Sequence, residues 1–377
     1  MSKVKLGEVA IEHKETCKGN KDGYPIVGLE HLVPEEVTLT AWDEGSDNTF
    51  TKMFRKGNVL FGRRRAYLKK AAVAPFDGIC SGDITVIEAI PDRILPMLLP
   101  FIIQNDELFD FAVGKSAGSL SPRVKWEHLK NYEFELPDMD KQRELAELLW
   151  AMDATKKSYH KLIAATDELV KSQFIERFGK PGTDPFRWGL TTLGKCCELN
   201  PRKPKGINTD DSYSFVAMPS VSEDGRIDAS VERPYSEVCK GFTYFAENDV
   251  LFAKITPCME NGKGGVAKGL KNGVGFGSTE FHVLRPIKGV SDPYWLYIIT
   301  MFSKFRSDAE KVMTGTGGQR RVPITYLSEY SITLPPIELQ EQFAAFVRQS
   351  DKSKFELEQA LSELTATYKR IIAENLG

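Results

Sequence analysis

The sequence lacks the long apolar runs that a membrane-spanning helix requires. Nowhere in its 377 residues does a stretch approach about 18 consecutive apolar side chains. Its opening residues, MSKVKLGEVA, contain nothing like the apolar core of a secretion signal. We therefore expect a cytoplasmic protein that does not cross a membrane.

Motifs for metal binding and catalysis are also missing. The six cysteines form no C-x-x-C pair and the five histidines are scattered singly, so the closely spaced ligands of a zinc site are absent. The sequence contains no G-x-x-x-x-G-K-[ST] loop for ATP and no N/D-P-P-Y/F loop of an adenine methyltransferase. It also lacks the clustered acidic residues near a lysine that a nuclease needs. These absences predict no metal, no cofactor of its own and no catalytic residues.

A strong excess of positive charge is absent as well. Lysine and arginine total 50 against 52 aspartate and glutamate, which gives a net charge of −2 and a pI near 6.3. Any binding of nucleic acid must therefore come from local basic segments or from the charge of a partner.

What the sequence does contain is an internal repeat. The phrase LPDMDKQRELAELL at residues 136–149 returns as LPPIELQEQFAAFV at residues 334–347, 198 positions later. The same offset holds without a gap to Glu176 and Glu374. A gapless match of this length indicates two copies of one structural plan.

The match continues upstream, with offsets that drift as loops of different length would make them do. FRKGNVLFGR from Phe54 corresponds to FAENDVLFAK from Phe245, and SGDITVI from Ser81 corresponds to STEFHVL from Ser278. These short β-branched and aromatic runs, bounded by glycine, asparagine and aspartate, are typical of strands joined by turns. Longer apolar runs follow them and predict helices, so each variable region is expected to be an α+β domain.

Each repeat ends in a segment free of proline and glycine, which predicts a helix of about 60 Å at 1.5 Å per residue. The predicted divisions are a first domain at 1–137, a helix at 138–178, a second domain at 179–335 and a helix at 336–377. Apolar residues at three- and four-residue spacing on these helices predict that they pair with each other as an antiparallel coiled coil with pseudo-two-fold symmetry. The predicted helix-pairing residues are Leu145, Leu148, Met152, Tyr159, Leu162, Leu169, Phe343, Phe346, Leu357, Leu361 and Leu364.

The two Leu-Pro-x-x-x-x-Gln phrases, together with VKSQFIERFGKP, ITPCMENGKG and GTGGQRRVP, resemble the specificity subunit of type I restriction–modification systems. The resemblance covers nearly the whole chain. It implies two target recognition domains that each read half of an asymmetric, bipartite site in double-stranded DNA. It also implies spacer helices on which two methyltransferase (modification) subunits dock, with restriction subunits where a system has them. The subunit itself would be non-catalytic, and S-adenosylmethionine would belong to the methyltransferase partner.

Basic and polar residues in loops after strands are the candidates for DNA contact, because phosphate contacts position a protein and base-edge contacts specify sequence. Two pairs of loops carry them, FGRRRAYLKK with the loop around Lys254, and KSAGSLSPRVKW with MTGTGGQRRVPI. An ordinary solvated loop is the alternative for each. The candidates are Arg63, Arg64, Arg65, Tyr67, Lys69, Lys115, Ser119, Arg123, Lys254, Asn261, Lys263, Lys268, Gln319, Arg320 and Arg321.

Two functions of different class stay open from the sequence. The first is a DNA sequence-specificity subunit that directs methyltransferase and restriction subunits to their target. The second is a duplicated coiled-coil adaptor that holds protein partners without binding DNA. The paired basic loops favour the first function, and the near-neutral net charge favours the second.

Overall fold

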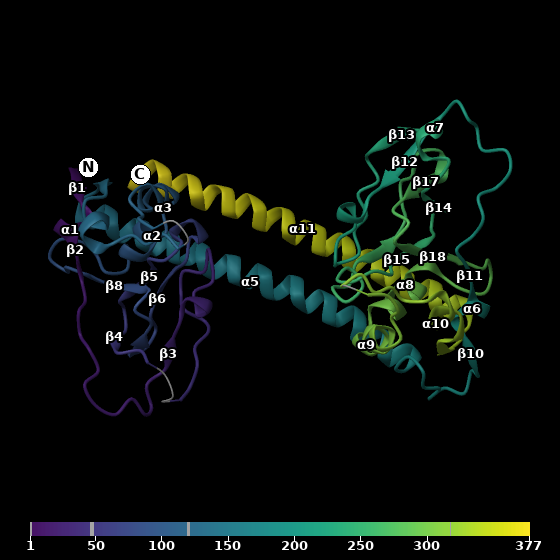
Figure 1. Ribbon diagram of the computed structural model, residues 1–377, viewed down its shortest axis with the longest axis horizontal. Coiled ribbons are helices and arrows are strands. Elements are labelled where there is room, and N and C mark those ends of the chain that lie inside the picture. Colours follow the sequence, from purple (N-terminus) through teal and green to yellow (C-terminus); the bar gives the residue numbers. More distant parts are fainter. Residues whose placement is uncertain (1, 46–48, 119–120, 317) are drawn as a thin grey trace. The chain divides into compact units, whose positions relative to one another are not determined.

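The computed structural model describes residues 2–45, 49–118, 121–316 and 318–377 (Figure 1). The chain divides into two compact units, one made of Met1–Lys161 with Leu357–Gly377 and the other of Leu162–Glu356. The division falls inside both long helices. Each unit therefore combines one α+β domain with parts of two helices, whereas the sequence predicted domains and helices as separate segments.

The first unit contains a four-stranded sheet in the order β2-β8-β5-β6 and a three-stranded sheet in the order β3-β7-β4, while β1 pairs with β9. Its strands are β1 (Ser2–Lys5), β2 (Ala10–Glu12), β3 (Ile26–Val27), β4 (Lys52–Phe54), β5 (Val59–Gly62), β6 (Ala71–Val73), β7 (Gly78–Cys80), β8 (Ile84–Ala89) and β9 (Glu133–Leu136). Its helices are α1 (Leu6–Val9), η1 (Leu29–His31), η2 (Ala66–Leu68), α2 (Leu99–Ile103), α3 (Asp106–Gly114), α4 (Trp126–Leu129) and the first part of α5 (Met139–Phe178).

The second unit repeats this topology with a four-stranded sheet β11-β18-β15-β16, a sheet β13-β12-β17-β14 and the pair β10 with β19. Its strands are β10 (Leu190–Thr192), β11 (Cys197–Leu199), β12 (Ser212–Val216), β13 (Glu232–Pro234), β14 (Thr243–Ala246), β15 (Val250–Ala253), β16 (Gly264–Val266), β17 (Val274–Gly277), β18 (Phe281–Pro286) and β19 (Ser331–Thr333). Its helices are α6 (Leu193–Cys196), η3 (Met218–Ser220), α7 (Tyr235–Val238), η4 (Lys271–Gly273), α8 (Pro293–Met301), α9 (Ser303–Lys311), α10 (Ile324–Glu329) and the first part of α11 (Ile337–Leu376).

The sequence repeat is therefore a structural repeat, and the α+β class is confirmed. In both units a parallel pair and an antiparallel pair meet on the same strand, β3 and β4 on β7 in the first unit, and β12 and β14 on β17 in the second. The central strands β5 and β15 are buried throughout, since each packs between neighbouring strands and helices. A strand buried on both faces requires a continuous apolar run, so VLFG and VLFA could be recognised as strands in the sequence.

Within each unit the two long helices contribute to one core. In the first unit Leu149 and Met152, early in α5, share a cluster with Ile372, late in α11. In the second unit the order is reversed, because Phe174 from the end of α5 packs on Phe343 from the start of α11, with ring centroids 5.5 Å apart. The beginning of one helix thus meets the end of the other, which is the antiparallel arrangement that the sequence predicted.

The predicted helix-pairing stripe is only partly correct. Leu145, Met152 and Phe343 are buried, and Tyr159, Phe346, Leu357, Leu361 and Leu364 are half-buried. Leu148, Leu162 and Leu169 are exposed, and the buried side chains Leu149 and Val170 lie one position further along. One residue turns an α-helix by about 100°, so a stripe displaced by one position faces a different neighbour.

The repeated Leu-Pro-x-x-x-x-Gln phrase has a structural purpose. The Gln142 side chain is buried, and its amide nitrogen donates to the Pro137 carbonyl (2.9 Å) while its oxygen accepts from the Leu95 amide (2.8 Å). Gln340 is fully buried and its oxygen accepts from the Asp292 amide (3.0 Å). In each unit this glutamine joins the first turn of a long helix to the loop before an apolar helix of the domain.

Candidate nucleic-acid interface

The candidate interface of the first unit begins where strand β5 ends. Arg63 follows the strand, and its amide donates to the Asp83 carbonyl (3.0 Å) while its own carbonyl accepts from the Val124 amide (3.0 Å). The backbone of Arg63 therefore holds together two loops that are distant in sequence. Two of the basic loops predicted from the sequence meet at this point.

An acidic side chain lies at the centre of this junction. Asp83 accepts from Arg123 Nε (2.7 Å) and lies 3.4 Å from Arg64 Nη1, while Arg64 Nε donates to Ser121 Oγ (2.5 Å). The hydrogen bond from Arg123 holds the pKa of the Asp83 carboxyl below its usual range. The Arg123 and Arg64 side chains stay about two-fifths exposed, so the carboxylate fixes their position and leaves part of each guanidinium facing solvent.

The second unit builds the same junction from corresponding residues. The Lys254 amide donates to the Glu280 carbonyl (2.9 Å), and the Lys254 carbonyl accepts from the Val322 amide (2.8 Å). Arg321 binds the Glu280 carboxylate with two hydrogen bonds, Nε to Oε2 at 2.9 Å and Nη2 to Oε1 at 2.8 Å. This pair also holds the pKa of the Glu280 carboxyl below its usual range. The residue pairs that the sequence repeat matched therefore occupy matching places in the structure.

The two acidic anchors were missed by the sequence reasoning. Asp83 and Glu280 lie two residues after Ser81 and Ser278, and each of these serine hydroxyls accepts from the backbone amide of its acidic residue at 3.2 Å. The repeat of SGD as STE was visible in the sequence. This repeat carried the signal, but the residues predicted to contact DNA were basic or neutral polar ones and included no acidic side chain.

The remaining candidates in the first unit have different surroundings. Arg65, directly before the short turn η2, and Tyr67, within it, are exposed, and the left-handed backbone of Arg65 (φ 53°) turns the chain there. Lys69 is paired with Asp106 at the start of α3 (2.6 Å), so it serves a contact within the unit. Lys115 is exposed, with its ammonium 5.8 Å from the Phe111 ring centroid. Ser119 lies outside the described residues.

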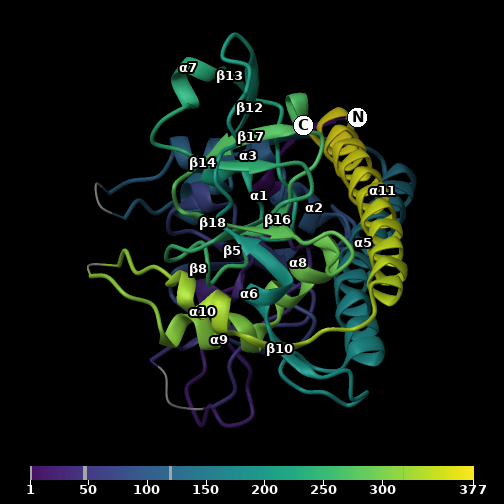
Figure 2. The same cartoon turned by 90° about the vertical axis from the view of Figure 1, so that its right-hand side faces the viewer.

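In the second unit the side chains of Gln319 and Asn261 are exposed. Arg320 is half-buried, and its guanidinium lies 3.5 Å from Glu310. The segment between α9 and α10 carries Arg320 and Arg321, and it projects from the unit (Figure 2). Lys254 is half-buried, and burial lowers the pKa of its ammonium. Its backbone, more than its charge, defines the junction.

The structure places two further lysines at opposite ends of the β15–β16 hairpin. Lys263 lies at the Lys254 end, where its carbonyl accepts from the Ala253 amide (3.2 Å), and its ammonium lies 3.4 Å from the Met218 carbonyl. Lys268 follows strand β16 and binds the side chain of Asn248, which precedes the antiparallel strand β15. Lys254 follows the other end of β15, so Lys268 and Lys254 lie at opposite ends of the hairpin. The sequence grouped them because they are close along the chain.

Two general features bear on the chemistry of the chain. Within residues 2–45, 49–118, 121–316 and 318–377, no group of three or more His, Cys, Asp or Glu side chains could hold a metal ion. No helix in the described part of the chain is both long enough and apolar enough to cross a membrane.

The chain is thus a duplicated two-domain protein. Each α+β domain is followed by a 40-residue helix, and each carries a loop whose arginine is fixed by a carboxylate. The family model for the type I restriction modification DNA specificity domain matches residues 1–165 and 187–365, and the chain belongs to this family. The resemblance found in the sequence is thereby confirmed.

The curated relatives support the same family. The chain is 36% identical to the specificity subunit of the Type I restriction enzyme EcoAI of Escherichia coli over 201 residues, which are 52% of this chain and 34% of that protein. It is 40% identical to the EcoEI specificity subunit of the same organism over 159 residues, 42% of this chain and 26% of that protein. Each match thus spans about a third or less of the relative's length.

Solved structures show the same fold. A type I restriction-modification S subunit from M. genitalium is similar over 98% of this chain and 94% of its own, with 12% identity and a TM-score of 0.56. A chain from a study of complex assembly and conformational transition in a type I R-M system covers 99% of this chain and 97% of its own, with 20% identity and a TM-score of 0.59.

Proposed function

We propose that this chain is the DNA sequence-specificity subunit of a type I restriction–modification system. The observation that carries the proposal is the duplicated junction, in which Arg123 on Asp83 and Arg321 on Glu280 are fixed in the same way beside a buried strand. Fixed, partly exposed guanidinium groups suit phosphate contacts and bidentate contacts to base edges. One such surface on each domain would read one half-site.

The two half-sites should differ in sequence. The backbone junctions are alike, but the flanking residues are not, because Arg63 and Arg64 of the first unit correspond to Lys254 and Ile255 of the second. Base readout depends on the side chains presented, so two unlike sets read two unlike sequences. The target would then be asymmetric and interrupted by unread base pairs.

The family supports a proposal about the partners. The relatives in Escherichia coli are specificity subunits of type I restriction enzymes, and we propose two methyltransferase subunits as partners, with restriction subunits where the system has them. S-adenosylmethionine would bind to the methyltransferase. This chain would supply target recognition to the complex and would leave the chemistry to its partners.

Genomic methylation mapping tests the proposal. The chain and the methyltransferase encoded beside it are expressed together in a host free of this methylation, and modified bases are mapped by long-read sequencing. We expect one bipartite, asymmetric motif. Identical methylation without the chain would refute the proposal and would favour a protein adaptor instead.

A domain exchange sharpens the test. Residues 1–137 are replaced by the corresponding region of another family member, with both spacer helices left unchanged. One half of the methylated motif should change and the other half should stay as it was. A change in both halves would show that the domains do not read their half-sites separately.

A further inference from the structure

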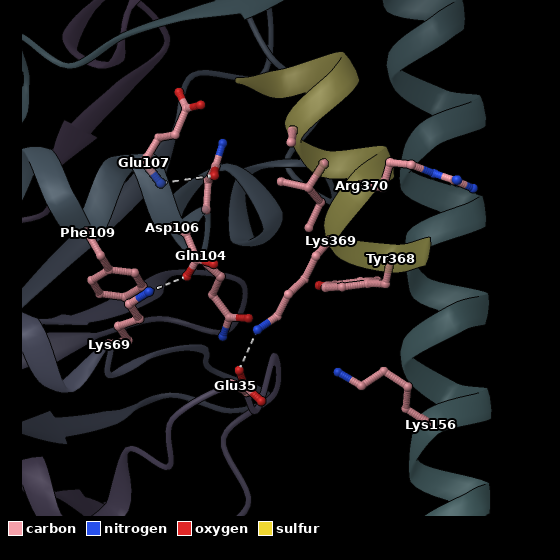
Figure 3. Close-up of a pocket in the computed structure, with 13 residues that line it drawn as sticks. Glu35, Lys69, Gln104, Asp106, Glu107, Phe109, Lys156, Tyr368, Lys369 and Arg370 are labelled. Atoms are coloured by element: carbon pink, nitrogen blue, oxygen red, sulfur yellow. Dashed lines mark hydrogen bonds and ion pairs between the residues drawn. The ribbon is translucent and has the colours of Figure 1, made fainter. Parts of the chain in front are cut away.

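The first unit contains a cavity of about 400 Å³ between the start of α3 and the end of α11 (Figure 3). Phe109 from α3 and Ile372 from α11 contribute apolar surface, and Lys156 reaches in from α5. Lys69 and Lys369 also line it, but they are paired with Asp106 (2.6 Å) and Glu35 (2.9 Å). The cavity therefore combines apolar walls with three ammonium groups, two of which are paired with carboxylates.

Lys156 differs from the paired lysines. Its ammonium lies 4.9 Å from the centroid of the Tyr368 ring and forms no ion pair within 4 Å among the described residues, although its charge acts on Glu35 from a longer distance and helps to lower the pKa of that carboxyl. Glu107 also lines the cavity, but its carboxylate points away from Lys156 (Figure 3). An ammonium in this setting keeps unused capacity for an ion pair.

The corresponding lysine of the second unit shows what such a site accepts. Lys354 lies 198 residues after Lys156 and is only 6% exposed. Its ammonium lies 2.9 Å from Asp167 on α5 and 3.4 Å from Asp224, which follows η3 in the domain. A lysine buried to this extent requires such partners. The second unit therefore supplies two carboxylates from its own chain.

The first unit forms neither of these contacts at ion-pair distance. Thr365 stands 198 residues after Asp167, so the helix carboxylate is replaced by a hydroxyl. Val27 pairs with strand β7 as Val216 pairs with strand β17, and the two valines are 189 residues apart in the sequence. The same offset of 189 matches Glu35 with Asp224. Glu35 pairs instead with Lys369.

A second, independent observation lies in the wall of the cavity. Tyr368 is 7% exposed, and its hydroxyl is buried without a hydrogen-bond partner among the described residues. The hydroxyl points toward the space between α11 and Gln104 (Figure 3). Buried polar groups are nearly always hydrogen-bonded, so an unpartnered hydroxyl beside an unpaired lysine points to an external acceptor.

We propose that this cavity binds an acidic side chain presented by an apolar segment of the methyltransferase subunit, an inference that rests on the proposed function for its partner. The carboxylate would pair with Lys156 as Asp167 and Asp224 pair with Lys354, and it would accept a hydrogen bond from Tyr368. The apolar part of the segment would cover the mainly apolar wall of the cavity, to which Phe109 and Ile372 contribute their few exposed atoms. The paired acidic residues around the rim disfavour a phosphate group, because its extra charge would meet Glu35 and Asp106.

Binding of the purified chain to the purified methyltransferase subunit, measured by calorimetry, tests this proposal. Lys156→Met keeps the apolar stem and removes the charge, and we expect it to raise the Kd at least tenfold. Lys156→Arg should restore most of the affinity, and Tyr368→Phe should weaken binding by a few fold. Lys161→Met is the matched control, since this exposed lysine on the same helix has no ion pair among the described residues; its Kd should stay within twofold of the parent chain.

The outcomes separate this proposal from the proposed function. Equal affinity of the Lys156→Met and Lys161→Met variants, with targeted methylation retained, would overturn the cavity assignment alone. Failure of the parent chain to bind the methyltransferase would overturn both proposals. A Lys156-dependent dimer of the chain alone in sedimentation experiments would replace the methyltransferase by a second copy. Thermal unfolding of each variant checks that Lys156→Met is folded.

Discussion

Replacing Gln340 by leucine should destabilise the start of α11 by about 2–4 kcal/mol, since each buried polar group left without a partner costs about 1–3 kcal/mol. The Gln340 amide nitrogen donates to the Pro335 carbonyl (2.8 Å) and the Val290 carbonyl (3.0 Å), and its oxygen accepts from the Asp292 amide. Leucine has a similar volume and cannot form any of these bonds. The Asp292 amide contributes most, because a carbonyl has two lone pairs and tolerates a lost partner better.

Hydrogen exchange measured by mass spectrometry is the appropriate assay, because two units of one chain need not unfold together. A loss of 2 kcal/mol corresponds to about 30-fold faster exchange for amides that open with the start of α11, since 1.4 kcal/mol is about tenfold. Gln142→Leu should have the same effect at the start of α5. Gln342→Leu, on an exposed position of the same helix turn, is the control. Unchanged exchange in Gln340→Leu would refute the role assigned to this glutamine.

Three further predictions concern the second unit and its counterpart. His282 is buried with its Nε2 2.8 Å from the Val322 carbonyl, and burial lowers its pKa to about 4. In the unfolded chain the His282 imidazole binds a proton near pH 6.5, so the free energy of unfolding should fall by up to about 3 kcal/mol as the pH drops from 6.5 to 4. Urea unfolding at several pH values should show this pH dependence, and His282→Gln should reduce it. Arg321→Ala should weaken DNA binding for all sequences, and the slope of log K against log salt concentration, measured by fluorescence anisotropy, should become smaller by about 0.9. An unchanged slope in both Arg321→Ala and Arg123→Ala would exclude phosphate contacts by these arginines. Lys354→Met should lower the free energy of unfolding of the second unit by about 1–2 kcal/mol, measured in urea. This is less than the 3–5 kcal/mol expected for breaking a fully buried pair, because Asp167 is partly exposed. A variant as stable as the parent chain would show that these ion pairs make no net contribution to stability.

The repeat in the sequence predicted the domain plan because long-range similarity does not depend on local propensity. Two strands that read VLFG and VLFA must be buried in the same way if their surroundings are copied. The stripe on the helices was less predictable. An apolar pattern of period 3.5 drifts against the 3.6 residues of a helix turn, so Leu148 and Leu149 were equally plausible from the sequence, and only the neighbouring domain decides that Leu149 is buried.

The candidate site was predicted in its cations and missed in its anions. Arg123 and Arg321 stood out as basic residues after flexible loops, but their carboxylate partners lie 40 and 41 positions earlier. No local pattern connects residues so far apart. The backbone bonds at Arg63 and Lys254 were likewise invisible, because a hydrogen bond from a main-chain amide does not depend on the side chain that identifies the residue.

The duplication explains why corresponding lysines can have different partners. Backbone contacts such as those at Arg63 and Lys254 are retained in both units because changing them would disrupt two loops at once. An ion pair made by side chains can be lost when one residue changes, as Asp167 and Thr365 illustrate. Lys156 then lies in a cavity with no carboxylate at ion-pair distance among the described residues, and an external carboxylate would complete it, whereas Lys354 has two carboxylate partners within the chain. If the methyltransferase supplies that group, the first unit should depend on assembly for the charge balance of its helix pair, and the second unit should not.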